Sequence, residues 1–181
     1  MGRDKALVSV AGKTLIEHVV AAVSAVSSRT IIVAPTSDSY RIDGAVTVPD
    51  LYPDEGPVGG ICTGLTAFGA GLHIVIACDM PGVQPGVLRL MLNSAQPGDD
   101  AVVVGSPDDH ETEPLCAVYR HSALAPLTEF MRSGRLSARA ALGCLNVRWF
   151  DRDSIRDVDP AGLSFLNINS EEDLAELEAR L

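Results

Sequence analysis

Short runs of apolar, often β-branched residues alternate along this chain with segments whose apolar positions recur at helical spacing. The apolar runs predict strands at 30–34, 45–48, 72–77, 101–104, 115–119 and 147–150. The helical spacing predicts helices from residue 14 onward, at 59–68 and 84–94, around 123–131 and 136–142, and at 170–181. Strands that alternate with helices are typical of βαβ units, whose crossovers make neighbouring strands parallel. We therefore expect an α/β fold with a mostly parallel sheet flanked by helices.

Two segments carry signals beyond periodicity. Thr14 and Glu17 have the spacing of a capping box, in which the two side chains satisfy free N–H groups at a helix start. The run 72–77 is nearly all apolar, which indicates a central parallel strand covered by helices on both faces. No repeat, linker or low-complexity tract divides the 181 residues, so we expect a single domain over 1–181.

Composition and charge limit the kinds of ligand and partner that we expect for this protein. The formal net charge of −10 argues against a nucleic-acid partner, because proteins that bind nucleic acids need a broad basic surface. A small phosphorylated ligand needs only one or two cations in a cleft, helped by backbone N–H groups. The four cysteines form no C-x-x-C pair, which favours free thiols in a reducing compartment. The sequence shows no signal-peptide pattern and no apolar run of membrane-spanning length, so we expect a cytoplasmic protein without a membrane partner.

The strongest candidate for chemistry is Asp79, in the segment C-D-M-P directly after the apolar run 72–77. In open parallel sheets, ligands bind beyond the carboxyl ends of the strands. A carboxylate at that edge can hold Mg²⁺, which prefers one or two carboxylates together with phosphate oxygens. An aspartate before Pro81 can equally cap a turn, and the residues alone leave both interpretations open.

Lys5 and Asp50 carry weaker signals. Lys5 belongs to M-G-R-D-K, a glycine followed by cations, which suits phosphate recognition, although a solvated tail explains it equally well. Asp50 ends a predicted strand before a loop rich in proline and glycine, and could accept hydrogen bonds from a nucleoside or serve as a turn residue. Arg135 and Arg139 share one helical face, where they could meet a phosphate or face solvent. No G-x-S-x-G elbow supports nucleophilic catalysis.

Taken in order, these segments resemble the molybdenum cofactor guanylyltransferases, the MobA family. The matching stretches are M-G-R-D-K-A-L, A-G-K-T-L-I-E-H-V, P-D-x(5)-G-P-V-G-G-I, C-D-M-P, P-L-C-A-V-Y-R, S-G-R-L-S-A and L-N-I-N-S-E-E-D-L. The resemblance covers almost the whole chain. It implies a Rossmann-like nucleotidyltransferase fold and an Mg²⁺-dependent enzyme that joins GMP from GTP to molybdopterin and releases pyrophosphate. Other molybdenum cofactor biosynthesis proteins and acceptor molybdoenzymes are the implied protein partners.

The resemblance also implies roles for individual residues. Lys5 would contact the nucleotide phosphates, and Asp79 would coordinate magnesium; these two are the expected catalytic residues. On the nucleotide side, Asp50 would hold the nucleoside and Gly60 would line the pocket. The remaining pair, Asn167 and Asn169 of the N-x-N element, is expected near the pterin-side cleft.

The sequence departs from the family pattern at two places. That pattern begins with an apolar strand and a glycine-rich L-A-G-G-x-S-x-R-M-G loop, whereas this sequence starts at the methionine of that loop. A central strand missing from a sheet would leave neighbouring edges unpaired, so we expect the natural protein to extend upstream and the domain over 1–181 to be N-terminally incomplete. Glu113 stands where relatives often carry histidine.

Two alternative functions stay open. Base choice in the family depends partly on the glycine loop, so an enzyme that transfers cytidylyl to the same pterin, or guanylyl to another phosphorylated acceptor, is the nearest rival. The other is a non-catalytic nucleotide-binding protein.

Overall fold

The computed structural model describes residues 4–107 and 112–180. Its strands are β1 (Ser9–Val10), β2 (Lys13–Thr14), β3 (Ile31–Ala34), β4 (Val46–Pro49), β5 (Leu72–Ile76), β6 (Ala101–Val104), β7 (Cys116–Arg120) and β8 (Val147–Phe150). Its α-helices are α1 (Leu15–Ser24), α2 (Gly56–Phe68), α3 (Pro85–Ser94), α4 (Leu124–Arg132), α5 (Ala138–Ala141) and α6 (Glu171–Arg180). Short 3₁₀ turns are η1 (Lys5–Leu7), η2 (His121–Ala123), η3 (Leu142–Cys144), η4 (Arg152–Ile155) and η5 (Leu163–Phe165). The predicted α/β alternation is confirmed, and the described residues contain no helix long and apolar enough to cross a membrane.

Local sequence signals account for how α1 begins. Thr14 is its N-cap: the Glu17 carboxylate accepts a hydrogen bond from the Thr14 backbone N–H at 2.7 Å, and the Glu17 N–H donates to the Thr14 hydroxyl at 3.4 Å. This is the predicted capping box. The buried residues of α1 recur every three or four positions, among them Leu15, Val19 and Val23, so one face of the helix packs on the core.

The main sheet has the strand order β5-β7-β6-β8, and it is mixed rather than purely parallel, with β5, β6 and β8 running in one direction. β7 runs antiparallel to both of its neighbours, β5 and β6, while β6 and β8 are parallel. The strand that departs from the expected parallel direction is β7, because the connection from β6 to β7 carries no crossover helix in its described residues and the chain returns in the opposite direction. As a result, the start of β7 lies at the edge where β5, β6 and β8 end.

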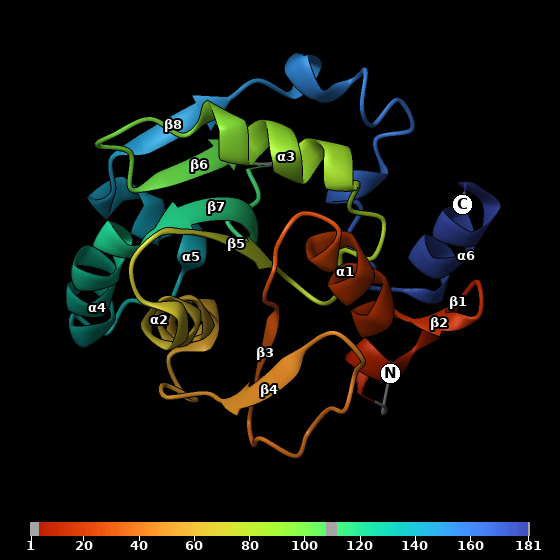
Figure 1. Cartoon of the computed structure of the whole chain (residues 1–181), viewed down its shortest axis with the longest axis horizontal. Helices are drawn as coiled ribbons and strands as arrows, with labels where there is room; N and C mark the ends of the chain where they lie inside the picture. Colours follow the sequence, from red (N-terminus) through yellow and green to blue (C-terminus); the bar gives the residue numbers. More distant parts are fainter. Residues whose placement is uncertain (1–3, 108–111, 181) are drawn as a thin grey trace.

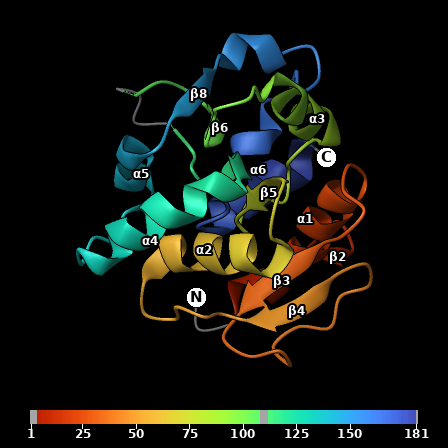
Figure 2. The same cartoon turned by 60° about the vertical axis from the view of Figure 1, so that its left-hand side comes forward.

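Helices cover both faces of this sheet (Figures 1 and 2). On one face, apolar side chains of α2, α4 and α5 pack in one buried cluster with alternate residues of β6 and β7, such as Val103 and Ala117. On the other face, α3 contributes Val87 and Met91 to a cluster with Val102. β6 and most of β7 are therefore buried on both sides, which explains their continuous apolar runs.

β3 and β4 form a separate parallel pair. No strand ladder joins β3 to β5 among the described residues, although α2 packs against both strands. A largely apolar cavity of about 780 Å³ lies between them, lined by β3, β5 and the facing sides of α1 and α2. The edges of two strands thus face one another across an apolar space.

Candidate active site

Three segments that are far apart in sequence meet beside the end of β5. The Lys5 ammonium group donates to the Asp79 carboxylate at 3.0 Å and to the Asn169 side-chain oxygen at 2.8 Å. The side chains of Lys5 and Asp79 are 30% and 28% exposed, so a ligand can reach both groups. Lys5 is held there by η1, which begins where the Asp4 carboxylate accepts a hydrogen bond from the Ala6 N–H.

Backbone hydrogen bonds hold this cluster in place. The N–H of Ala77, the residue after β5, donates to the Leu115 carbonyl, and the Asp79 carbonyl accepts from the Ile168 N–H at 2.8 Å. Ile168 is the middle residue of the N-x-N element, so the two asparagines lie on either side of the residue that binds the Asp79 backbone. The Asp173 carboxylate accepts from the Asn169 N–H at 2.7 Å, and the backbone N–H donors of Asn169 and Ser170 lower the Asp173 pKa.

The two asparagines of the N-x-N element have different partners. Asn169 binds Lys5, whereas the Asn167 side-chain N–H donates to the Glu113 carboxylate at 3.0 Å. Burial raises the pKa of Glu113 above its ordinary value, and the hydrogen bond from Asn167 and the charges of Arg139 and Arg152 oppose that rise. Sequence reasoning noted Glu113 only as a departure from the family pattern, and no local signal could have indicated a contact across 54 residues.

Asp50 lies in a turn after β4. Its carboxylate accepts hydrogen bonds from the Thr63 hydroxyl at 2.6 Å and the Tyr52 N–H at 3.0 Å. Those contacts have the geometry of a turn residue, one of the two interpretations left open by the sequence. Asp50 therefore makes contacts on the β4 and α2 side of the molecule, separate from the contacts of Lys5.

Gly60 lies within α2 and lines the cavity between β3 and β5. A methyl group added there would meet no atom within 4 Å. Its neighbour Gly59 is different, since an added Cβ would press into the carbonyl oxygen of Tyr52 and lie 3.0 Å from the Tyr52 Cβ. The close packing of the 50–55 turn against α2 therefore requires glycine at position 59, a requirement that sequence reasoning missed.

The donor set at Asp79 fits magnesium held mainly by a substrate. The described residues contain no group of three or more His, Cys, Asp or Glu that could hold a metal ion by themselves. Mg²⁺ commonly uses one or two carboxylates and takes its other ligands from phosphates and water. Asp79 supplies one partly exposed carboxylate, so the ion would bind here together with a phosphorylated ligand.

Solved structures with this arrangement of strands and helices define the class. The chain superimposes with a TM-score of 0.73 on 2-C-methyl-D-erythritol 4-phosphate cytidylyltransferase from Thermus thermophilus, covering 97% of this chain and 93% of that one at 20% identity. It matches molybdopterin-guanine dinucleotide biosynthesis protein A from Archaeoglobus fulgidus with a TM-score of 0.83 and 32% identity, covering 99% of this chain and 91% of that one. The fold is that of a nucleotidyltransferase.

Sequence comparison identifies the family. Residues 1–146 match the MobA-like NTP transferase domain. The molybdenum cofactor guanylyltransferase of Desulfosudis oleivorans is 34% identical over 181 residues, which cover 99% of this chain and 88% of the relative. A probable molybdenum cofactor guanylyltransferase of Chloroflexus aggregans is 33% identical over 172 residues, 94% of this chain and 82% of the relative. The chain belongs to the MobA-like nucleotidyltransferase family.

Proposed function

We propose that this nucleotidyltransferase transfers GMP from GTP to the terminal phosphate of molybdopterin and releases pyrophosphate. The observation that carries the proposal is the Lys5–Asp79–Asn169 cluster at the edge of the sheet, in a chain whose relatives are named for guanylyl transfer to the molybdenum cofactor. The cluster offers one cation, one carboxylate and one amide to a phosphorylated ligand. The proposed compartment is the cytoplasm, with acceptor molybdoenzymes downstream.

The chemistry is an in-line displacement. An oxygen of the acceptor phosphate attacks the α-phosphorus of GTP, a new P–O bond forms, and the bond to the bridging oxygen breaks as pyrophosphate leaves. Two polyanions must approach each other, so positioning and charge neutralisation contribute most of the catalysis. No general base is needed, because a phosphate nucleophile is already ionised at neutral pH.

Lys5 and Asp79 have different roles in positioning and neutralising the phosphates. In the absence of ligand the two side chains neutralise each other at 3.0 Å. When a triphosphate binds, Lys5 exchanges Asp79 for phosphate oxygens and holds them as a compact charge. Asp79 would then hold Mg²⁺, which supplies charge stabilisation at the reacting phosphate. Asn169 keeps the Lys5 ammonium near the site during this exchange.

The nucleoside is assigned to the side of the cluster where β4 and α2 lie. Asp50 would act there through the turn that it caps, and Gly60 would present a surface without a side chain to the nucleotide. Asn167 is assigned to the acceptor side because its partner is Glu113 rather than Lys5.

The test is transfer of an α-labelled nucleotide to molybdopterin, with GTP, CTP and ATP in parallel. We expect label in the pterin dinucleotide, and pyrophosphate in equal amount, with GTP only. Transfer from CTP would assign the protein to cytidylyl transfer. Binding of GTP without pyrophosphate release, in the presence of magnesium and acceptor, would assign it to non-catalytic nucleotide binding.

A further inference from the structure

Polar side chains form a row along the sheet edge on which Asp79 lies. The strand order places Asp79 after β5, Glu113 before β7, Ser106 after β6 and Arg152 after β8. Because β7 is antiparallel to its neighbours, its start and the ends of the other strands share this edge. The row leads away from β3 and β4, which lie beyond β5 on the other side of the cavity that β3 and β5 both line.

A second cavity, of about 390 Å³, opens at the far end of this row. Gly105, Ser106, Trp149, Asp151 and Arg152 line it. Its volume lies in the range of pockets that hold a small organic ligand. Trp149 offers an aromatic surface for a flat ring, and Arg152 brings a guanidinium group that also stacks on Phe165, 5.2 Å from its centroid.

Glu113 lies between Asp79 and this cavity in the row. It is half-buried, and one oxygen of its carboxylate accepts the hydrogen bond from Asn167. Burial raises the Glu113 pKa most, while the positive charge of Arg152, which lines the cavity, lowers this pKa and the charge of Asp79 raises it. An ionised carboxylate has two acceptor oxygens, so Glu113 can also accept hydrogen bonds from a ligand that presents paired N–H donors.

We propose that Glu113 recognises the acceptor of the reaction by accepting hydrogen bonds from the 2-amino group and the adjacent ring N–H of a 2-amino-4-oxopyrimidine, the edge of a pterin. The inference rests on the proposed function, which names a pterin phosphate as the acceptor. The fused ring extends toward Trp149, and Arg152 adds positive charge to the cavity. A ring without the amino group leaves the half-buried carboxylate short of a partner, so the site discriminates against it.

Guanine presents the same paired N–H donors as a pterin, so the position of Glu113 in the site decides which of the two substrates it binds. In-line transfer places the attacking oxygen of the acceptor opposite the leaving pyrophosphate, and the nucleoside and the acceptor ring therefore need separate parts of the site. The nucleotide is assigned to the side of Asp50 and Gly60, whereas Glu113 and the 390 Å³ cavity lie on the other side of Asp79. This arrangement assigns Glu113 to the pterin.

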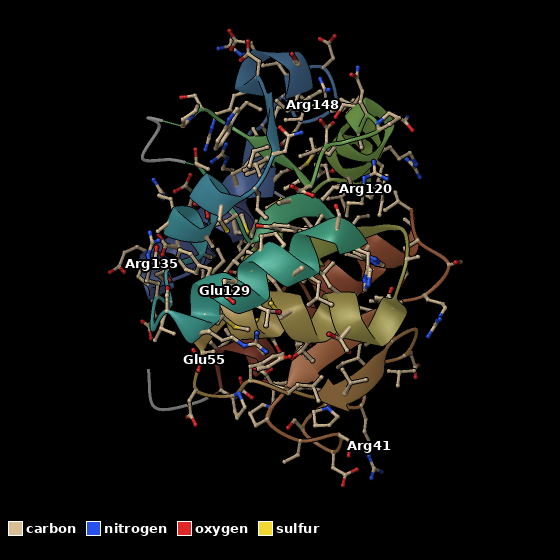
Figure 3. All side chains as sticks on the ribbon, turned by 90° about the vertical axis from the view of Figure 1, so that its left-hand side faces the viewer. Arg41, Glu55, Arg120, Glu129, Arg135 and Arg148 are labelled. Atoms are coloured by element: carbon tan, nitrogen blue, oxygen red, sulfur yellow. The ribbon has the colours of Figure 1, made fainter. Side chains whose placement is uncertain are left out.

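The experiment compares pterin with lumazine, which carries oxygen in place of the 2-amino group. Trp149 is the single tryptophan of the chain and lines the cavity, so its fluorescence reports ligand binding there directly. We expect pterin to quench Trp149 and to bind about tenfold or more tightly than lumazine. Glu113→Gln should remove this preference, whereas Glu129→Gln, an exposed change on α4 (Figure 3), should leave it unaltered.

A second arm compares GTP with inosine triphosphate, which lacks the guanine amino group. Glu113→Gln should leave that preference unchanged; if it abolishes the GTP preference instead, Glu113 reads the nucleotide and the proposal is wrong. Equal binding of pterin and lumazine by the unaltered protein would also overturn it. Guanylyl transfer with an unchanged pterin preference in Glu113→Gln refutes only this inference. Pterin preference without any transfer refutes only the proposed function.

Discussion

Alanine substitutions at two neighbouring glycines of α2 should have opposite effects on the stability of the fold. Gly60 and Gly64 lie inside the helix with nothing within 4 Å of an added Cβ. Alanine costs less backbone entropy than glycine in a helix interior, so each Gly→Ala change should stabilise the chain by about 0.5–1 kcal/mol. For a domain of this size the melting temperature should then rise by about 1–4 °C.

Gly59→Ala should do the reverse. The added methyl would overlap the Tyr52 carbonyl oxygen, and the turn carrying Asp50 would have to move away from α2. Overpacking of this kind costs about 1–3 kcal/mol, which exceeds the entropic gain. The helix propensity change is the same at 59 and 60, so the difference between the two variants isolates the contact with Tyr52.

Calorimetric melting of the three variants checks this reasoning, and GTP titration adds a functional readout. If Gly60 faces the nucleotide, Gly60→Ala should melt higher yet bind GTP more weakly, whereas Gly64→Ala, one turn further along α2, should only melt higher. Gly59→Ala melting at or above the unaltered protein would refute the packing argument. Equal GTP affinity of the 60 and 64 variants would refute the place of Gly60 in the nucleotide pocket.

Three further predictions follow from the site, the sheet and the cavity. Asp79→Asn should lower the turnover of GTP by about a hundredfold or more at saturating magnesium while the melting temperature stays unchanged; near-normal turnover would remove Asp79 from the catalytic residues. The hydrogen bond from Arg148 (labelled in Figure 3) holds the Asp99 pKa below its usual value of 3.8. The pair therefore contributes its full stability above pH 3.8, and this contribution is lost as the pH falls through the lowered pKa of Asp99. In urea unfolding, Arg148→Met should be less stable than the unaltered protein at pH 7 and equally stable in strong acid. An equal loss of stability at every pH would contradict this. Extending the chain upstream with an apolar strand and a glycine-rich loop should fill the space between β3 and β5, raise the melting temperature and tighten GTP binding, whereas an extension carrying proline in the strand should do neither.

Local sequence determined most of the secondary structure. The capping box at Thr14 and the apolar spacing after it set the start and the buried face of α1, because both act within one or two helical turns. Runs such as 101–104 predicted strands with accurate bounds because residues buried on both faces must all be apolar. The helix predicted at 136–142 is shorter, since α5 gives way to the 3₁₀ turn η3, and α2 begins at Gly56 rather than 59.

The sequence also singled out Lys5, Asp79 and Asn169, but only the tertiary structure shows that these three side chains touch. Contacts across 74 and 164 residues depend on how the chain crosses the sheet, and periodicity carries no information on that. The antiparallel direction of β7 could not be predicted either, because an apolar run has the same pattern whichever way the strand runs in the sheet. The direction of β7 brings Glu113 to the sheet edge on which Asp79 lies. A local sequence pattern cannot predict this proximity, because it depends on strand direction.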